Sequence, residues 1–171
     1  MKQKNADKST AELASTASSA NQLEQEEAHH DYHFAEQVGH QLRRAYQRHV
    51  AIFQEMIPDS QLTSAQFVVM CAVLEQHSCS LTEITKMTAI DQATVRDIVK
   101  RLKARALLAV EHDLSDKRKV LVRLTDQGNE LINEVLPFAA RITESTFGEL
   151  NPAERMALLY LLQKMNKFDQ A

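Results

Sequence analysis

Glycine and proline are scarce in this 171-residue chain, which contains three residues of each. Both residues interrupt helices and mark turns, so their scarcity predicts helices joined by short connections. Hydrophobic residues make up 44% of the sequence and charged residues 25%, the usual balance of a globular protein with a packed core. The sequence therefore predicts one mainly helical domain of ordinary size, with room for an additional tail.

Cysteines and long apolar runs are also few. Cys71 and Cys79 are eight residues apart, which matches neither a CxxC motif nor a disulfide framework. No apolar run approaches the roughly 18 residues needed to span a membrane. The N-terminal segment has no apolar core of the kind found in secretory signals. We expect a reduced, cytoplasmic protein with no cofactor and no membrane partner.

Charge is unevenly distributed along the chain, whose net charge is −3. Between Asp91 and Arg123, nine Lys and Arg residues against five Asp and Glu residues give a local charge of +4, and the rest of the chain carries −7. A basic patch on an acidic body can bind phosphates while the body repels wrong approaches. This stretch is therefore the candidate nucleic-acid interface.

Within that stretch the sequence predicts two short helices joined by a tight turn. Ser80 and Glu83 form a capping box that opens a helix through Met87, with Leu81, Ile84 and Met87 expected to face inward. A turn at 88–90 follows, and Asp91 caps the next helix. This arrangement is a helix-turn-helix.

The second of these helices has one apolar and one basic face. Its buried face is expected to hold Val95, Ile98, Val99 and Leu102, at helical spacing. The first turn exposes residue types that can contact base edges, and later turns expose lysines suited to phosphates. A solvated basic face is the alternative. The predicted DNA-contacting residues here are Gln92, Ala93, Thr94, Arg96, Lys100 and Lys103.

A charged hairpin comes next, with strands expected at 107–111 and 120–124. Its tip carries Lys117, Arg118 and Lys119. Arg118 on a narrow loop suits the minor groove, where negative potential is concentrated. The hairpin favours DNA binding over a merely solvated helix.

Helices are expected on both sides of this region. The first runs from Phe34 to Ile57 and stops before Pro58, and a second runs from Thr63 to about His77. Thr125 caps a helix to about Phe147 with a kink expected at Pro137, and the last helix runs through about Phe168. Its MALLYLLQKM segment is too apolar for one-sided burial, so with the first helix it is the expected dimer core.

These patterns divide the chain into four expected segments. Residues 1–28 form a disordered polar tail, since their composition cannot offset the entropy of ordering. Residues 29–60 form a dimerisation helix, 61–125 a winged helix-turn-helix DNA-binding domain, and 126–171 further dimerisation helices. The fold class is mainly α, with a two-stranded β wing.

The order of elements resembles the MarR family of winged-helix transcriptional regulators. The chain departs from the family pattern at Leu114, where proline is usual, and at Lys117 and Asp97, where arginine is usual. Ala106 replaces a glycine, and we expect this to remove the usual left-handed helix stop. The residues that carry the resemblance are Leu62-Thr63-x-x-Gln66, Asp91-x-x-Thr94-Val95 with Val99, Arg101 and Leu102, Asp113-x-x-Asp116-x-Arg118, and Val122-x-Leu124-Thr125-x-x-Gly128.

The resemblance implies an obligate homodimer on a palindromic operator in double-stranded DNA, released by a small aromatic or heteroaromatic acid. Arg43 is then the expected carboxylate partner, because its planar fork pairs bidentately with carboxylate. Residues 29–49 also resemble nicotinate-degradation regulators within the family. The other predicted effector-binding residues are Tyr46, His49, Phe67, Met70, Cys71 and Leu74.

Three alternatives remain open. His29 and His33 supply two possible metal ligands at i,i+4, although no motif completes a metal site. Cys71 or Cys79 suggests redox sensing, since Cys79 precedes a helix start where a thiolate can be stabilised. A winged helix can also bind protein instead of DNA. An enzyme is not expected, because no glycine-rich loop offers a nucleophile beside a base and an oxyanion site.

Overall fold

The computed structural model describes residues 32–112 and 120–167. The predicted tail at 1–28, His29, and the wing-tip residues Leu114, Lys117, Arg118 and Lys119 lie outside the described residues. The chain divides into two compact units, Met1–Ala45 and Tyr46–Ala171.

The described part of the first unit is helical but does not form one continuous helix. A single turn of 3-10 helix, η1 (Phe34–Glu36), precedes α2 (Val38–Met56), which continues into the second unit. The prediction of one helix from Phe34 was wrong at its start, because Gln37 has an extended backbone with ψ of 136°. The side chain of Gln37 donates instead to the carbonyl of His33, at 3.3 Å.

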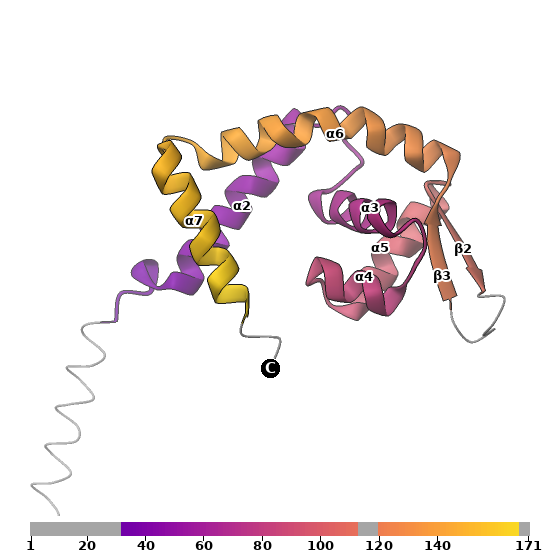
Figure 1. Cartoon of the computed structure of the whole chain (residues 1–171), viewed down its shortest axis with the longest axis horizontal. Helices are drawn as coiled ribbons and strands as arrows, with labels where there is room; N and C mark the ends of the chain where they lie inside the picture. The colour runs from indigo at the N-terminus through magenta and orange to yellow at the C-terminus, as the bar shows by residue number, and fades with distance from the viewer. Residues whose placement is uncertain (1–31, 113–119, 168–171) are drawn as a thin grey trace, which may run out of the picture. The chain divides into compact units, whose positions relative to one another are not determined.

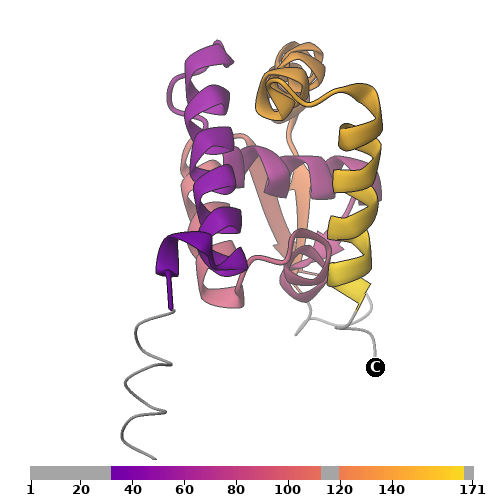
Figure 2. The ribbon, with the colours of Figure 1, turned by 90° about the vertical axis from the view of Figure 1, so that its left-hand side faces the viewer.

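The second unit contains a winged helix. Its elements are α3 (Ser64–Gln76), β1 (Cys79–Ser80), α4 (Leu81–Thr88), α5 (Gln92–Ala104), β2 (Leu108–His112) and β3 (Val120–Leu124). The sheet is antiparallel in the order β1-β3-β2. α3 contacts α4, α5, α6 and β3, and Figures 1 and 2 show the hairpin of β2 and β3 beside these helices.

The core of this unit is built from the residues that the sequence placed on apolar faces. Val69, Val73, Val95 and Leu102 are fully buried where α3 packs against α5. Met87 is an exception, because its side chain is 41% exposed although it was expected to face inward. α4 has eight residues, and Ile84 is the one residue of this helix that is buried.

Two alanines have left-handed backbone conformations at the ends of α4 and α5, namely Ala89 with φ of 54° and Ala106 with φ of 57°. The expectation that the loss of glycine at 106 removes the left-handed stop was therefore wrong. The amide of Leu107 donates to the carbonyl of Leu102 at 3.0 Å, and Ala106 donates to Lys103 at 2.9 Å. These bonds form a Schellman motif, which holds an alanine where glycine is easier.

Two more helices complete the second unit. α6 (Asp126–Phe147) is capped by Thr125 and continues through Pro137 as one helix. α7 (Pro152–Asn166) begins at a capping box formed by Asn151 and Glu154, and none of its residues is buried. Over the ranges 32–112 and 120–167, no helix has the length and apolar character that crossing a bilayer requires.

Candidate nucleic-acid interface and ligand pocket

α5 presents a basic face to solvent on the side away from the core. Val95, Ile98, Val99 and Leu102 are buried, as the spacing predicts. All six residues expected to contact DNA from this helix are exposed, namely Gln92, Ala93, Thr94, Arg96, Lys100 and Lys103. The helix can therefore offer its first turn to base edges and its later turns to phosphates.

Asp91 fixes the start of α5. Its carboxylate accepts from the amide of Thr94 at 3.0 Å and from the hydroxyl of Thr94 at 2.6 Å. The hydrogen bond from the Thr94 side chain, followed by that from its amide, lowers the pKa of Asp91. Since the Thr94 hydroxyl donates its proton to Asp91, it retains only acceptor capacity towards another group.

An ion pair joins the C-terminal end of α5 to the loop between α2 and α3. The guanidinium of Arg105 forms an ion pair with the carboxylate of Asp59. The other oxygen of that carboxylate accepts from the amide of Gln61 at 2.9 Å. Arg105 and Asp59 are partly buried, so the pair is less screened than a surface pair.

The base of the wing is held together by pairing between strands. β2 and β3 pair from Leu108 with Leu124 to His112 with Val120. Arg123 forms an ion pair with Glu111 across the two strands. Arg123 therefore has a partner within the wing, although it contributes to the basic charge of the stretch.

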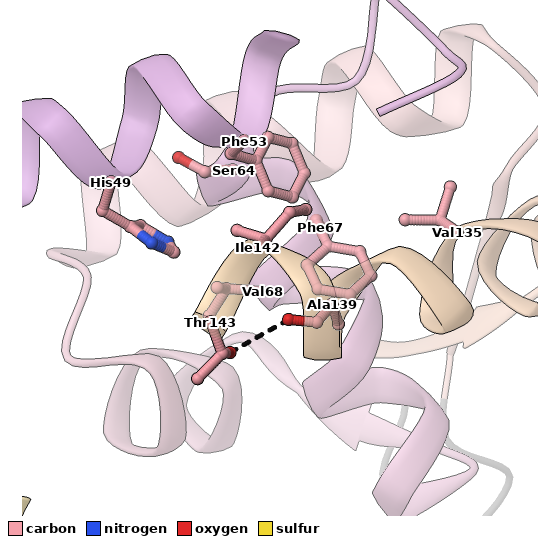
Figure 3. A pocket seen from close by; sticks show the side chains of 9 residues that line it. All are labelled: His49, Phe53, Ser64, Phe67, Val68, Val135, Ala139, Ile142 and Thr143. Atoms are coloured by element: carbon pink, nitrogen blue, oxygen red, sulfur yellow. Dashed lines mark hydrogen bonds between the residues drawn. The ribbon is translucent and has the colours of Figure 1, made fainter. Parts of the chain in front are cut away.

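A small pocket lies between α2, α3 and α6 within the second unit. Its volume is about 120 Å³. Figure 3 shows His49 near one end and Val135 at the other, with aromatic rings from Phe53 and Phe67 between them. These two rings are tilted, with centroids 5.5 Å apart. An apolar cavity of about 150 Å³ can hold benzene, so this space suits roughly one six-membered ring.

The polar atoms of the pocket are few. Among the described residues that line it, His49 supplies the one imidazole, and Ser64 and Thr143 supply hydroxyls. Thr143 donates its hydroxyl proton to the carbonyl of Ala139 at 2.9 Å, as Figure 3 shows. Ser64 is almost fully buried, and no described residue hydrogen-bonds its hydroxyl. The pocket thus combines apolar walls with a few fixed polar atoms, as ligand sites do.

The seven predicted effector-binding residues are spread over several places. His49 and Phe67 line the pocket. Met70 is fully buried in the core, and Cys71 is partly buried against it. Leu74 lines a different hollow, of about 90 Å³, with His77 and Asn129. Arg43 and Tyr46 are exposed on α2, and the Tyr46 ring centroid is 6.5 Å from that of His49.

Sequence reasoning missed the wall that α6 contributes. Val135, Ala139, Ile142 and Thr143 follow helical spacing and form one stripe. That periodicity was visible in the sequence, but it only indicated a buried face. Phe53, Ser64 and Val68, from α2 and α3, were also not predicted.

The cysteines do not have the environment of reactive thiolates. Burial raises the pKa of Cys79 to about 11, and the Glu83 carboxylate adds to the effect. Burial likewise raises the pKa of Cys71 to about 11, with a contribution from Glu75. At Cys79 the cost of lost hydration therefore outweighs the stabilisation that a helix start can give to a thiolate, which disfavours the redox alternative. Within the described ranges, no group of three or more His, Cys, Asp or Glu residues can hold a metal ion.

Known proteins resemble this chain in both sequence and fold. Residues 51–135 match the family described as "Transcriptional regulator SarA/Rot". The chain is 52% identical over 139 residues to the HTH-type transcriptional repressor NicR of Pseudomonas putida, covering 81% of this chain and 88% of NicR. This chain belongs to the MarR family of winged-helix transcriptional regulators.

Two solved structures of the family have folds similar to that of this chain. The BpsR protein of Bordetella bronchiseptica is 65% identical, with a TM-score of 0.75 over 80% of this chain and 98% of BpsR. Its structure is described as a mechanism for regulation of DNA binding by 6-hydroxynicotinic acid. A mutant of E. coli MarR in complex with operator DNA is 23% identical, with a TM-score of 0.70 over 75% of this chain and 92% of MarR, which shows the fold alone.

These relatives confirm the predicted family, the winged-helix fold and the class of DNA-binding, ligand-responsive regulator. The resemblance to nicotinate-degradation regulators agrees with them as well. The proteins that this chain resembles are regulators and not enzymes.

Proposed function

We propose that this protein is a cytoplasmic, non-enzymatic repressor that binds a palindromic operator as a homodimer. A heteroaromatic carboxylic acid of the 6-hydroxynicotinic acid type releases it from DNA. The observation that carries the proposal is the ring-sized pocket between α2, α3 and α6, with one imidazole at its end. The high identity to BpsR, whose DNA binding 6-hydroxynicotinic acid regulates, supports this choice of effector.

The exposed face of α5 supports a specific DNA contact for each of its predicted residues. Gln92, Ala93 and Arg96 read base edges in the major groove, and Thr94 can accept a hydrogen bond beside them. Lys100 and Lys103 bind phosphates. The wing tip, with Lys117, Arg118 and Lys119, enters the minor groove, with Arg118 as the main contact.

The apolar surface of α7 supports dimerisation. Met156, Tyr160 and Leu161 are each more than half exposed, and the helix has no buried residue within the protomer. Large apolar side chains that are exposed together on one helix of a protomer are typical of an interaction surface. A second copy that covers it brings two α5 helices to successive major grooves, about 34–36 Å apart.

The effector proposal assigns the carboxylate to Arg43 and the ring to the pocket. The described residues of the pocket walls offer no Lys or Arg, and an unpaired carboxylate in an apolar site is costly. Arg43 is exposed on α2, the helix that also carries His49, so it is available to a charged group.

The test uses an operator recovered by in vitro selection from random DNA with the full-length protein. Fluorescence anisotropy should show tight binding that 6-hydroxynicotinic acid weakens, and sedimentation should give a dimer. Arg96→Ala should change sequence preference, whereas Lys100→Ala should weaken binding to all sequences and flatten its salt dependence. Arg43→Ala should retain DNA binding but lose release by the acid.

Failure to select any DNA sequence would instead favour a winged helix that binds protein. Release that is unaffected in Arg43→Ala would place the carboxylate elsewhere. Quantitative recovery of unchanged 6-hydroxynicotinic acid after prolonged incubation checks that the protein is not an enzyme for this compound.

A further inference from the structure

A hydroxyl on α6 fixes which nitrogen of His49 is free. Nδ1 of His49 lies 3.0 Å from Oγ1 of Thr146. That hydroxyl donates to the carbonyl oxygen of Ile142, at 2.7 Å. A hydroxyl has one proton, so Thr146 can only accept from His49. Nδ1 of the neutral imidazole therefore carries the proton, and Nε2 is an acceptor with no hydrogen-bond partner among the described residues.

The last turn of α6 holds Thr146 in this position. The guanidinium of Arg48 donates to the carbonyls of Ser145 and Thr146, each at 3.1 Å. Gly148 follows with φ of 58°, and a Cβ atom there would lie 3.1 Å from the Arg48 guanidinium nitrogens. Adjacent residues of α2 thus bind the end of α6 at three points. Turning the His49 ring by 180° would place a ring carbon against the Thr146 hydroxyl oxygen. The hydrogen bond between His49 and Thr146 would then be lost.

The apolar walls of the pocket make it important that Nε2 of His49 is a hydrogen-bond acceptor. Phe53, Phe67 and Val68 line it with apolar atoms that cannot donate a hydrogen bond to this nitrogen. A partly buried acceptor such as Nε2 loses its hydration without a replacement when a ligand places another acceptor against it. A ligand that reaches the imidazole should therefore bring a donor.

Nicotinic acid and 6-hydroxynicotinic acid, two closely related pyridine carboxylic acids, differ in this respect. In its lactam form, 6-hydroxynicotinic acid has a ring N–H beside a carbonyl. Nicotinic acid has a ring nitrogen with only a lone pair. The first can donate to Nε2 of His49, whereas the second presents an acceptor to an acceptor.

We propose that His49 is the specificity-determining residue of this pocket and that Thr146 is its positioning residue. Together they select heteroaromatic acids with a ring N–H or O–H donor over acids with a bare ring nitrogen. The inference rests on the proposed function, because it concerns the effector of the same pocket. It adds a residue, Thr146, that does not line the pocket.

The test is calorimetric titration of the full-length protein with 6-hydroxynicotinic acid and with nicotinic acid. The wild type should bind the first at least about tenfold more tightly, since sites built around a hydrogen bond reject analogues that lack it. Thr146→Val keeps the shape but removes the acceptor, so the affinity ratio should fall to within about threefold. Thr146→Ser keeps the hydroxyl and should restore the ratio.

Thr85→Val is the matched control. Thr85 is also partly buried, and its hydroxyl also donates to the carbonyl four residues earlier, at 2.9 Å, but it lies on α4 away from the pocket. The Thr85→Val variant should have the same ratio of affinities for 6-hydroxynicotinic acid and nicotinic acid as the wild type. If Thr146→Val is poorly folded, Thr146→Ala removes the same oxygen without adding a β-methyl in its place.

The outcomes separate the two proposals. A wild type that binds neither acid overturns the proposed function, and the inference with it. A wild type that prefers 6-hydroxynicotinic acid, together with a Thr146→Val variant of unchanged preference, overturns the inference alone. The inference alone is also overturned if the wild type and Thr146→Val each bind the two acids with equal affinity.

Discussion

At Gly128 the first turn of α6 lies close to the backbone of Leu107, which follows α5. A Cβ atom there would lie 2.1 Å from the carbonyl oxygen of Leu107 and 3.2 Å from Cδ2 of Leu124. That carbonyl accepts from the amide of Thr125 at 3.2 Å, and the Thr125 hydroxyl donates to the carbonyl of Ala106 at 2.6 Å. Gly128→Ala must therefore move backbone that is held by hydrogen bonds.

The expected loss of stability can be worked out from these contacts. Overpacking of a well-packed site costs about 1–3 kcal/mol, and one lost backbone hydrogen bond costs about 1 kcal/mol. Alanine regains about 1 kcal/mol of helix propensity relative to glycine. The net prediction is a loss of about 2 kcal/mol in the free energy of unfolding.

Urea denaturation followed by circular dichroism measures this loss. Protomer concentration must be fixed, because dimerisation makes apparent stability depend on it. Gly39→Ala is the matched control, since Gly39 lies in α2 and no described atom is within 4 Å of its Cβ position. It should lose nothing and gain up to about 1 kcal/mol. Equal stability of Gly128→Ala and wild type would refute the close approach of α6 to Leu107.

Three further predictions concern single residues. Ala106→Gly should raise the free energy of unfolding by up to about 1 kcal/mol, since glycine adopts the φ of 57° without strain; an unchanged melting temperature would contradict this. Asp59→Asn should cost about 1–2 kcal/mol in chemical denaturation, because it leaves the partly buried Arg105 without its counter-charge; Arg105→Gln in the same background should then add little. A raised pKa keeps Cys71 and Cys79 protonated at pH 8, so iodoacetamide should label the folded protein slowly there and faster as pH rises towards 11; mass spectrometry showing rapid labelling at pH 7 would restore the redox alternative.

The helix-turn-helix could be predicted because its signals are local. The capping box at Ser80 and the Asp91 cap each join residues three positions apart, and each is formed as expected. The spacing of Val95 and Ile98 likewise fixes the buried face of α5 without reference to the rest of the chain. Interactions of this range are contained in a few consecutive residues.

The pocket could not be predicted in full, because its walls come from segments that are distant in the chain. Phe67 and His49 were expected, but Phe53 and Ile142 were not, and Met70 went to the core. An apolar residue at helical spacing can face a core or a cavity, and only the packing of neighbouring helices distinguishes the two.

Other features depended on contacts between distant residues in the same way. The two-residue strand at Cys79 exists because it pairs with Val122, and the left-handed Ala106 is held by the bond from Leu107 to Leu102. The tautomer of His49 depends on Thr146, 97 residues away. Local propensity and charge could thus indicate a DNA-binding regulator, whereas the shape and hydrogen-bonding polarity of its ligand pocket arise only when α2, α3 and α6 pack together.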